Sequence, residues 1–409
     1  MNTLKFGNGE WYGKKDTILA YNDENSNFKP LPFSFDRASS ATVINKAGLI
    51  ETVGSGEPRI DFSNDAKGAL KLEPQRTNKY LYSQDFSDAY WTKSGTSVVS
   101  GFASPDGTLN AFKLIGDGAN TPHILRKYIG ATALTNHSFS FFVKKGEINK
   151  LGIREDAQTG AYASFNLTTK TIISSVSMTL TYEEVGDYLR LKVVSQIGSN
   201  GTAGYAIYML DDTYSGGVVN GSRVIPNGSG FYIYGAQLEQ GSYPTSYIPT
   251  SGSVVTRSKP IVSSSDLSAK GIINSTEGTY FIDIKFPSMP TRDASTGGFV
   301  LGSDNSFPSP QGLEIATDLD GSLRIGKRDG SFIQIFDTTN GVYHKIAFKW
   351  DLLNVKLFVD GILQYTGTYS ATPFKYLYSD TGDGSKIIKD IKLYNTALTD
   401  QELINLTTI

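Results

Sequence analysis

Residues Gly235 to Arg257 read GAQLEQGSYPTSYIPTSGSVVTR. The strand that leads into this segment, Phe231–Leu238, alternates aromatic and small side chains, which is typical of a half-buried β-strand. The remainder is rich in proline, serine, threonine and glycine and has no periodicity, which predicts an extended, non-helical exit from that strand. We therefore expect one domain to close at this segment and another to follow it.

The composition indicates an all-β protein with more than one domain. At 409 residues the chain is too long for a single core. It contains 42 glycines, 23 tyrosines and 22 phenylalanines, and glycine interrupts nearly every periodic run, so strands and turns are favoured over long helices. We predict an all-β fold with two jelly-roll β-sandwich domains in tandem and an N-terminal extended arm.

Charge and cysteine content argue against several classes of function. The 38 Lys and Arg residues nearly balance the 40 Asp and Glu residues, so neither nucleic-acid binding nor attraction to an anionic membrane is expected. The chain has no cysteine, which excludes disulfides, thiol catalysis and cysteine-based metal sites. No apolar signal segment opens the chain and no apolar run is long enough to span a bilayer. We expect synthesis in the cytoplasm and a soluble product without membrane insertion.

Shifts in composition predict five segments. They are an N-terminal arm at 1–35, a β-hairpin connector at 36–78, a first β-sandwich at 79–250, a Ser-rich linker at 251–275 and a second β-sandwich at 276–409. The arm is polar with scattered aromatic residues, which fits either a mobile terminus or a segment that orders against a partner or another copy. The charged residues of the connector fit either ion pairs or a solvated surface. These charged residues are Arg37, Glu57, Arg59, Glu73 and Arg76.

Strands about ten residues apart, with turn signals between them, predict the first sandwich. The expected strands are Thr108–Leu114, Ile124–Ile129, Ser138–Val143, Lys150–Glu155, Ala161–Asn166, Met178–Tyr182, Tyr188–Val194, Tyr205–Leu210 and Phe231–Leu238. The residues expected to point inward are Phe112, Leu114, Phe139, Phe141, Ile153, Leu189, Leu191, Val193, Ile207 and Ile233. Trp91 and Trp350 are expected to be core residues of their sandwiches.

Local signals in the second sandwich predict tight turns and one helix. Asp320-Gly321, Asp329-Gly330 and Asp360-Gly361 are two-residue hairpin signals, because glycine accepts the positive φ of a type I′ turn. Thr399, followed three residues later by Glu402, predicts a capping box at the start of a short helix.

Two parts of the chain resemble known families. The order of Tyr343–Trp350, Lys356–Gly361 and Ile391–Leu403 resembles the laminin-G/concanavalin-A-like lectin and glucanase jelly roll. Three segments, Phe33–Ile50, Gly56–Phe62 and Gly68–Trp91, together with Gly235–Arg257, resemble a recurring module of tailed-bacteriophage fibre and appendage proteins. In that module the middle sandwich resembles a carbohydrate-binding-module jelly roll. The opening residues, 1–32, resemble those of fibre proteins from phages of Bacteroidetes, including crAss-like phages.

The resemblance implies a structural virion protein, a head or tail fibre subunit whose lectin-like sandwiches adhere to host or mucus glycans. Its implied partners are other virion proteins (capsid, portal-tail or fibre base), further copies in a dimer or trimer, and cell-surface or mucus polysaccharide. The expected location is the virion. The residues assigned to virion attachment are Phe6, Trp11 and Tyr12. A free or cell-surface glycan-binding module and a purely decorative role stay open as alternatives.

Glycan binding would use exposed aromatic faces against the apolar face of a pyranose, with polar groups for its hydroxyls. Tyrosine-rich loops supply the candidates. They are Tyr214, Tyr243, Tyr247, Tyr365, Tyr369, Tyr376 and Tyr378. The alternative is that these side chains pack the sandwich or a subunit contact.

No cofactor is required by this interpretation, and a structural Ca²⁺ is the metal that the resemblance allows, because such folds hold Ca²⁺ with loop oxygens. The candidate ligands are Asp211, Asp212, Glu239, Asp318 and Asp320, with Asp380 and Asp383 as a further pair. Asp-Gly pairs also form turns without any metal.

Catalysis is not expected. The histidines, His123, His137 and His344, are scattered, and no nucleophile elbow, zinc-binding helix or phosphate-binding loop is present. Glycoside hydrolysis needs two carboxylates across one bond; the Glu-x-Asp-x-x-Glu strand on which lectin-like glucanases typically mount them is absent, and Asp283 and Glu314 are the nearest single carboxylates.

Overall fold

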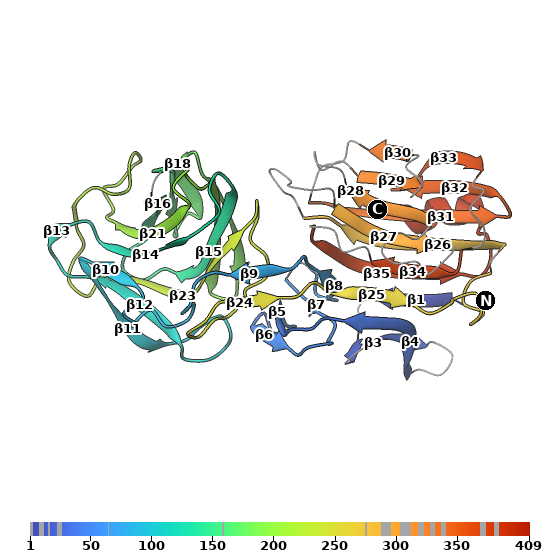
Figure 1. The fold of residues 1–409 in the computed structure, drawn as a ribbon, viewed down its shortest axis with the longest axis horizontal. Coiled ribbons are helices and arrows are strands. Elements are labelled where there is room, and N and C mark those ends of the chain that lie inside the picture. Colours follow the sequence, from blue (N-terminus) through green and yellow to red (C-terminus); the bar gives the residue numbers. More distant parts are fainter. Residues whose placement is uncertain are drawn as a thin grey trace. The chain divides into compact units, whose positions relative to one another are not determined.

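The computed structural model divides the chain into two compact units (Figure 1). Unit 1 comprises Met1–Lys46, Thr52–Gln75 and Ser258–Ile409, and unit 2 comprises Ala47–Glu51 and Arg76–Arg257. The structure describes residues 3–7, 12–14, 17–22, 27–63, 65–157, 159–274, 276–287, 296–302, 312–317, 323–327, 332–336, 341–368, 374–379 and 384–409. Strands dominate these residues, which confirms the all-β prediction.

Unit 2 is a sandwich of two six-stranded antiparallel sheets. Sheet 2a has the order β10 (Thr92–Ser94), β14 (Ile124–Gly130), β21 (Thr202–Leu210), β16 (Lys150–Glu155), β17 (Tyr162–Asn166) and β18 (Thr171–Val176). Sheet 2b has the order β11 (Thr96–Phe102), β12 (Ala111–Gly116), β23 (Gly230–Gln240), β15 (Asn136–Lys144), β20 (Tyr188–Gln196) and β19 (Thr179–Val185). Two short pairs complete the unit, β13 (Asn120–Thr121) with β22 (Arg223–Val224), and β9 (Arg76–Asn78) with β24 (Val255–Arg257).

The core of unit 2 lies between these sheets and contains every residue predicted to point inward, from Phe112 to Ile233. Trp91 belongs to the same core, as predicted. Strands β9, β10, β11, β13, β18, β22 and β24 were not predicted from the sequence. Most of these strands are short or have largely exposed residues, so they carry little hydrophobic alternation.

The segment after β23 closes unit 2, as its composition predicted. Its loop folds back on the strand: the Gln237 side-chain oxygen accepts from the Ile248 amide at 2.6 Å. The Tyr247 hydroxyl lies 2.7 Å from that of Ser83. Unit 2 ends at Arg257, whose guanidinium donates to a backbone carbonyl of this same loop. Hydrogen bonds from side-chain amides and hydroxyls thus take the place of the regular backbone hydrogen bonds that this proline-containing segment cannot form.

Unit 1 is built from two larger sheets. Sheet 1a has the order β33 (Ile362–Thr368), β32 (Asn354–Val359), β31 (Tyr343–Asp351), β26 (Glu277–Lys285), β35 (Lys386–Tyr394), β8 (Ala69–Leu72) and β7 (Ile60–Asp61), and β1 (Thr3–Gly7) also pairs with β35. Sheet 1b has the order β2 (Tyr12–Lys14), β3 (Thr17–Asn22), β4 (Asn27–Asp36), β25 (Ile261–Ser264), β34 (Tyr376–Ser379), β27 (Thr296–Gly302), β28 (Gly312–Thr317), β29 (Leu323–Lys327) and β30 (Phe332–Phe336). A shared core that includes Trp350 joins them, as predicted for that residue.

The prediction of a separate N-terminal arm was wrong for the described residues. Strand β1 pairs antiparallel with β35 from Thr3↔Tyr394 to Gly7↔Asp390, while β2, β3 and β4 extend sheet 1b. Without β1, this part of β35 would expose a row of backbone N–H and C=O groups. The pairing joins opposite ends of the chain, so no local periodicity reveals it.

The predicted Ser-rich linker is not a spacer: its residues up to Arg257 belong to unit 2, and those from Ser258 onward belong to unit 1. Strand β25 pairs with β4, and the Ser34 and Ser263 hydroxyls lie 2.8 Å apart across this pair. Leu267 and Ile273, which follow, are fully buried in the core of unit 1. Serine is tolerated in β25 because its backbone groups pair with β4 and its hydroxyl groups find hydrogen-bond partners across the strands.

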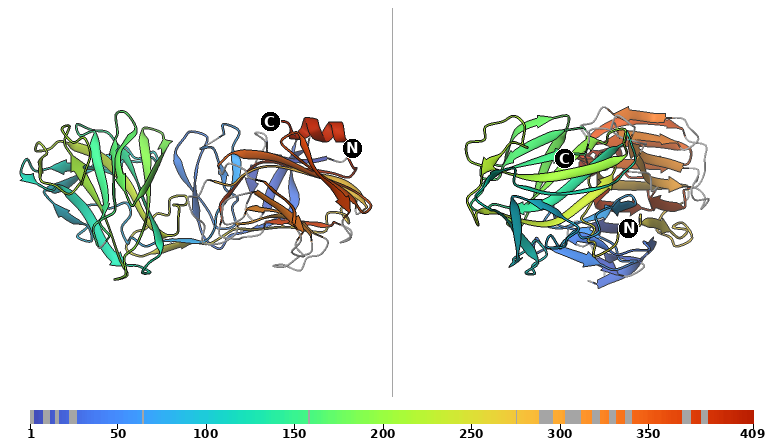
Figure 2. Two further views of the ribbon diagram at one scale, coloured as in Figure 1. Left: turned by 90° about the horizontal axis from the view of Figure 1, so that it is seen from above. Right: turned by 60° about the vertical axis from the view of Figure 1, so that its left-hand side comes forward.

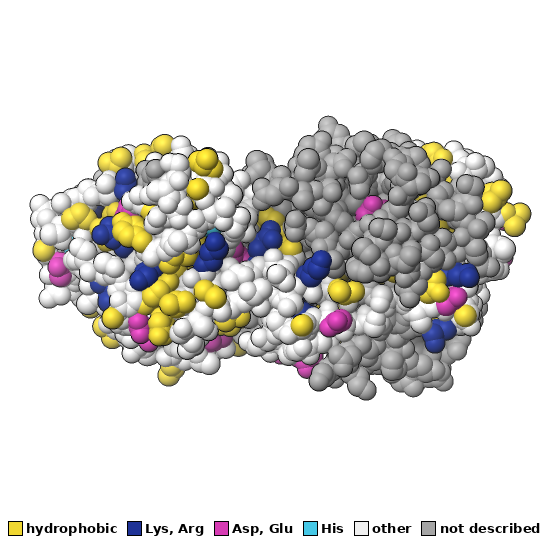
Figure 3. Space-filling view, viewed as in Figure 1, with side chains coloured by type: hydrophobic (Ala, Val, Ile, Leu, Met, Phe, Trp, Pro, Cys, Tyr) yellow, Lys and Arg dark blue, Asp and Glu magenta, His cyan; other side chains and the backbone are white. Residues whose placement is uncertain are grey.

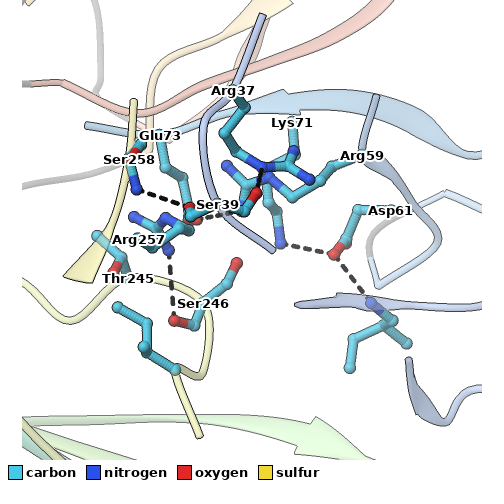
Figure 4. A network of polar contacts seen from close by, with 12 residues as sticks. Arg37, Ser39, Arg59, Asp61, Lys71, Glu73, Thr245, Ser246, Arg257 and Ser258 are labelled. Carbon is cyan, nitrogen blue, oxygen red and sulfur yellow. Dashed lines mark hydrogen bonds and ion pairs between the residues drawn. The ribbon is translucent and has the colours of Figure 1, made fainter. Parts of the chain in front are cut away.

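The connector carries a buried polar network rather than a solvated surface (Figure 4). The Arg37 guanidinium is 1% exposed and donates to the carbonyls of Ser39, Glu57 and Gly54 at 2.6–2.8 Å. The fully buried Arg59 donates to the Glu73 carboxylate at 2.5 Å. Nearby, β5 (Ala41–Ile44) and β6 (Ile50–Val53) form the predicted hairpin.

Helix α1 (Asp400–Thr407) begins with the predicted capping box between Thr399 and Glu402. Its Leu403 packs with Phe281 and Phe358 of sheet 1a and with Leu398, which precedes the helix, and Figure 2 shows the helix lying on this sheet. We expect Thr399→Ala to destabilise unit 1 by about 1 kcal/mol, because the Glu402 amide loses its acceptor. Chemical denaturation checks this value, and Thr399→Ser, which keeps the hydroxyl, serves as the control.

Other local signals are confirmed where the structure describes them. Asp360 and Gly361 have φ values of 51° and 81° between β32 and β33, as a type I′ turn requires. The other two Asp-Gly pairs lie outside the described residues, although the strands that flank them are paired. No helix in the described part of the chain is long and apolar enough to cross a membrane.

We expect unit 2 to lose stability as the pH falls from 6.5 to 4. His137 is fully buried on β15, and burial, with the Lys79 ammonium 3.5 Å away, lowers its pKa to about 4. The unfolded chain takes up a proton on His137 at higher pH than the folded chain does. This contribution to stability is therefore complete above pH 6.5 and is lost as the pH falls to about 4, which costs about 3 kcal/mol. Denaturation of unit 2 at several pH values tests this expectation. His137→Gln should flatten the profile, and an unchanged profile in that variant would contradict it.

Candidate functional site

The structure removes three tyrosines from the predicted glycan site. Tyr214, Tyr247 and Tyr378 are at most 4% exposed, so no sugar can stack on their rings. Tyr214 is held by its hydroxyl, which donates to the Gly217 carbonyl and lies 3.2 Å from the Ser164 hydroxyl. For these three residues the packing alternative is correct.

The remaining predicted tyrosines do not form one site. Tyr243, in unit 2, is half-buried under the Arg76 guanidinium, which lies 5.5 Å from its ring centre. Tyr365 and Tyr376 are half-buried in unit 1, and Tyr365 packs against the core there. Tyr369 lies outside the described residues. The role of these four residues stays a prediction.

Two of the predicted metal ligands that the structure describes, Asp211 and Glu239, use their carboxylates to accept hydrogen bonds from nearby loop residues. Both oxygens of the buried Glu239 accept from Thr245, through its amide at 2.8 Å and its hydroxyl at 2.5 Å. One Asp211 oxygen accepts from the amides of Thr213 and Tyr214, and Asp212 is exposed beside it. Asp318, Asp320 and the pair Asp380 and Asp383 lie outside the described residues. Within the described ranges no three acidic or histidine side chains are placed to hold a metal.

The described residues assigned to virion attachment do not lie together, and neither do the two single carboxylates that were considered for hydrolysis. Phe6 lies in β1 and Tyr12 in β2, in different sheets of unit 1, and Trp11 lies outside the described residues. Asp283 is on β26 of sheet 1a, whereas Glu314 is on β28 of sheet 1b. Burial raises the pKa of Asp283 to about 6. These two carboxylates therefore do not share a sheet.

A different group of side chains forms a built surface on the outer face of sheet 2a. Leu125, Ile153 and Ile207 point into the core, so the residues that alternate with them point outward. We name the outward group the arginine–tyrosine face. It consists of Arg126, Tyr128, Arg154, Asp156, Tyr162 and Tyr208.

Strand register brings this face together from four neighbouring strands. Arg126 lies opposite Ala206, which lies opposite Arg154, and Arg154 lies opposite Tyr162. The two arginines therefore flank a small residue on the central strand β21. Neighbouring strands are about 4.8 Å apart, so the face extends roughly 14 Å from β14 to β17.

Tyr128 is the most exposed aromatic side chain of the face, at 41%. Its ring lies on Gly204, where a Cβ atom would come within 2.1–2.2 Å of two ring carbons. The Arg126 guanidinium lies 5.0 Å from the ring centre. Glycine at position 204 thus lets the ring lie close to the sheet while much of it faces solvent.

Asp156 holds the two arginines in position. It forms an ion pair with Arg154, and its other oxygen is 3.6 Å from the Arg126 guanidinium. The Tyr208 hydroxyl donates to this carboxylate at 2.5 Å, and burial together with this hydrogen bond raises the pKa of Tyr208. The tyrosine therefore stays a neutral donor, and the carboxylate is fully engaged.

The loop after β16 is fixed by the buried Glu155. Its carboxylate accepts from the amides of Ala157, Thr159 and Gly204 at 2.8–3.1 Å. Glu155 therefore ties the loop that carries Asp156 to β21. A charged group that receives several amide hydrogen bonds makes a rigid support for the face.

Exposed rings beside guanidinium groups are suited to binding a hydrated, ring-shaped ligand. A tyrosine offers an apolar face to C–H groups, and arginine donates in a planar fork. Figure 3 shows hydrophobic side chains next to Lys and Arg over unit 2. This face was not predicted from the sequence because its residues are far apart along the chain. The alternating pairs Arg126/Tyr128 and Gly152/Arg154 were the available signal.

Comparison with known proteins identifies no family. No family model matches the sequence, and no curated protein matches it. Domain 4 of AbnA, a GH43 extracellular arabinanase from Geobacillus stearothermophilus in complex with arabinotriose, shares 16% identity and a TM-score of 0.28, covering 37% of this chain and 73% of that chain. The CBM40 of Ruminococcus gnavus IT-sialidase, bound to α2,3-sialyllactose, shares 20% identity and a TM-score of 0.27, covering 35% and 90%.

The metal-free VIP36 exoplasmic/lumenal domain shares 10% identity and a TM-score of 0.27, covering 35% of this chain and 77% of that chain. Scores of this size carry no argument about the ligand. The candidate site therefore depends on its own geometry.

Proposed function

We propose that this chain is a non-catalytic structural protein of a bacteriophage virion, a head or tail fibre subunit that adheres to host or mucus glycans. The resemblance of Phe33–Ile50, Gly68–Trp91 and Gly235–Arg257 to the phage appendage module supports the virion role. The arginine–tyrosine face is the observation that carries the adhesive role, because it combines an exposed ring with oriented donors on a rigid sheet.

Binding of the purified chain to immobilised mucin and bacterial polysaccharides tests the adhesive role. We expect Tyr128→Ala to weaken binding about tenfold or more, since a stacked ring is lost. Tyr182→Ala is the matched control, because Tyr182 is 40% exposed on β19 of sheet 2b, close to the 41% of Tyr128. Equal binding by the Tyr128 variant and the wild type would contradict adhesion through this face.

Gold labelling of purified particles with antibody against this chain tests the virion role. Gold on the tail tip or baseplate would indicate host attachment, and gold over the capsid would indicate a head fibre. Particles without gold would overturn the virion role and leave a free glycan-binding module. Deletion of residues 1–32 is not a suitable test, since β1 to β4 belong to the sheets of unit 1.

A further inference from the structure

We propose that the arginine–tyrosine face recognises an anionic saccharide, with a ligand carboxylate bound by Arg126. This inference rests on the proposed glycan adhesion and names the class of glycan. It follows from the net positive charge of the face, from the position of the Arg126 guanidinium and from the positions of Tyr128 and Tyr162.

The face presents positive charge to solvent. Arg126 and Arg154 carry two positive charges against the single negative charge of Asp156. The Arg126 and Arg154 side chains are 32% and 25% exposed, whereas that of Asp156 is 3% exposed. The neutralising carboxylate thus lies beneath the guanidinium groups, and a ligand meets the cations first. Arg223 on β22 lies 4.8 Å from the ring centre of the buried Tyr214, and the loop that carries Tyr214 begins with the carboxylates of Asp211 and Asp212.

Arg126 is held in place yet retains donors for a ligand. Its nearest carboxylate oxygen, on Asp156, is 3.6 Å away, beyond hydrogen-bond distance. Stacking near Tyr128 limits its motion. A planar guanidinium oriented in this way can bind a carboxylate through two parallel N–H···O bonds, with little ordering cost.

The tyrosines favour a sugar over a small inorganic anion. Tyr128 lies two residues from Arg126 on β14, and Tyr162 on β17 lies opposite Arg154, about three strand spacings, or roughly 14 Å, across the sheet from β14. An acidic oligosaccharide can place a ring face on the exposed Tyr128 and a carboxylate at the neighbouring Arg126, whereas Tyr162 packs partly against the cluster around Ala206 and Tyr208. Single-stranded nucleic acid also uses stacking and cations. The near-neutral net charge of −2 favours the saccharide.

The test compares two polymers with the same sugar backbone, one with free carboxylates and one in which the carboxylates are neutral methyl esters. The full chain is titrated with polygalacturonate and with fully methyl-esterified polygalacturonate at low salt. We expect binding to the acid form that weakens with added salt and is lost on esterification. Arg126→Gln should lower affinity for the acid form about tenfold or more. Lys144→Gln, which removes one positive charge from β15 on sheet 2b, should leave it unchanged.

The outcomes separate this inference from the proposed adhesion. Equal binding of the acid and ester forms, with loss in Tyr128→Ala but not in Arg126→Gln, would retain adhesion and overturn anionic recognition. Dextran sulfate, included as a second anion source, should bind more weakly than polygalacturonate if a carboxylate is preferred, and stronger binding would overturn the carboxylate assignment. Tighter binding of oligo-dT than of polygalacturonate would overturn the assignment of a saccharide ligand. Absence of binding to every polymer would overturn both proposals.

Discussion

Arg59→Ala is expected to lower the free energy of unfolding of unit 1 by about 3–5 kcal/mol, because it removes one partner of a buried ion pair. Arg59 is fully buried and Glu73 is 7% exposed, with 2.5 Å between their interacting atoms. Hydrogen–deuterium exchange in increasing denaturant, followed separately in peptides of β35 and β23, measures each unit. The loss should be confined to unit 1.

A double variant provides the control for this result. Arg59→Met combined with Glu73→Leu replaces the ion pair by apolar side chains of comparable length, so it should lose less stability than Arg59→Ala alone. If the double variant were less stable than Arg59→Ala, the ion pair with Glu73 would not be the main stabilising contact of Arg59. Other hydrogen bonds of the two side chains would then contribute more. Equal losses in both units would contradict the division of the chain.

Trp91→Ala is expected to destabilise unit 2 by about 3–5 kcal/mol, the usual cost of truncating a buried tryptophan. Trp91 is 4% exposed, and its ring centre lies 4.9 Å from that of Tyr80 and 5.3 Å from that of Phe86. Its indole N–H donates to the Tyr82 carbonyl at 2.9 Å. The same exchange experiment measures the loss in β23 peptides.

Trp91→Phe serves as the control for the tryptophan prediction. It keeps most of the ring volume and loses the hydrogen bond, so a smaller loss of stability is expected. Wild-type stability in Trp91→Ala would show that the segment before β10 does not contribute to the core of unit 2.

Adhesion through the arginine–tyrosine face would gain from repetition. A single shallow surface of this kind is suited to weak binding, since Asp156 and Tyr208 are already satisfied by protein contacts. Two or three copies in a fibre would raise the effective affinity without any new contact. The predicted dimer or trimer is therefore consistent with the proposed role, and sedimentation of the purified chain can measure it.

Features that depend on neighbours within a few residues were predictable. Alternation placed Phe139, Leu191 and Ile233 in the core of unit 2, because side chains on a strand point to opposite faces in turn. The capping box of Thr399 and the turn at Asp360-Gly361 follow from local hydrogen bonding and from the permitted φ of glycine. The all-β class of the chain follows from the same local rules.

Features that depend on distant parts of the chain were decided only in the folded molecule. The pairing of β1 with β35, and of β25 with β4, satisfies backbone groups on strands that are hundreds of residues away, and a polar strand carries no mark of its partner. Whether a tyrosine is exposed depends on what covers it: Tyr214 is buried by its loop, whereas Tyr128 lies open on Gly204. The arginine–tyrosine face exists because register aligns four strands, and register is set by the packing of the whole sandwich.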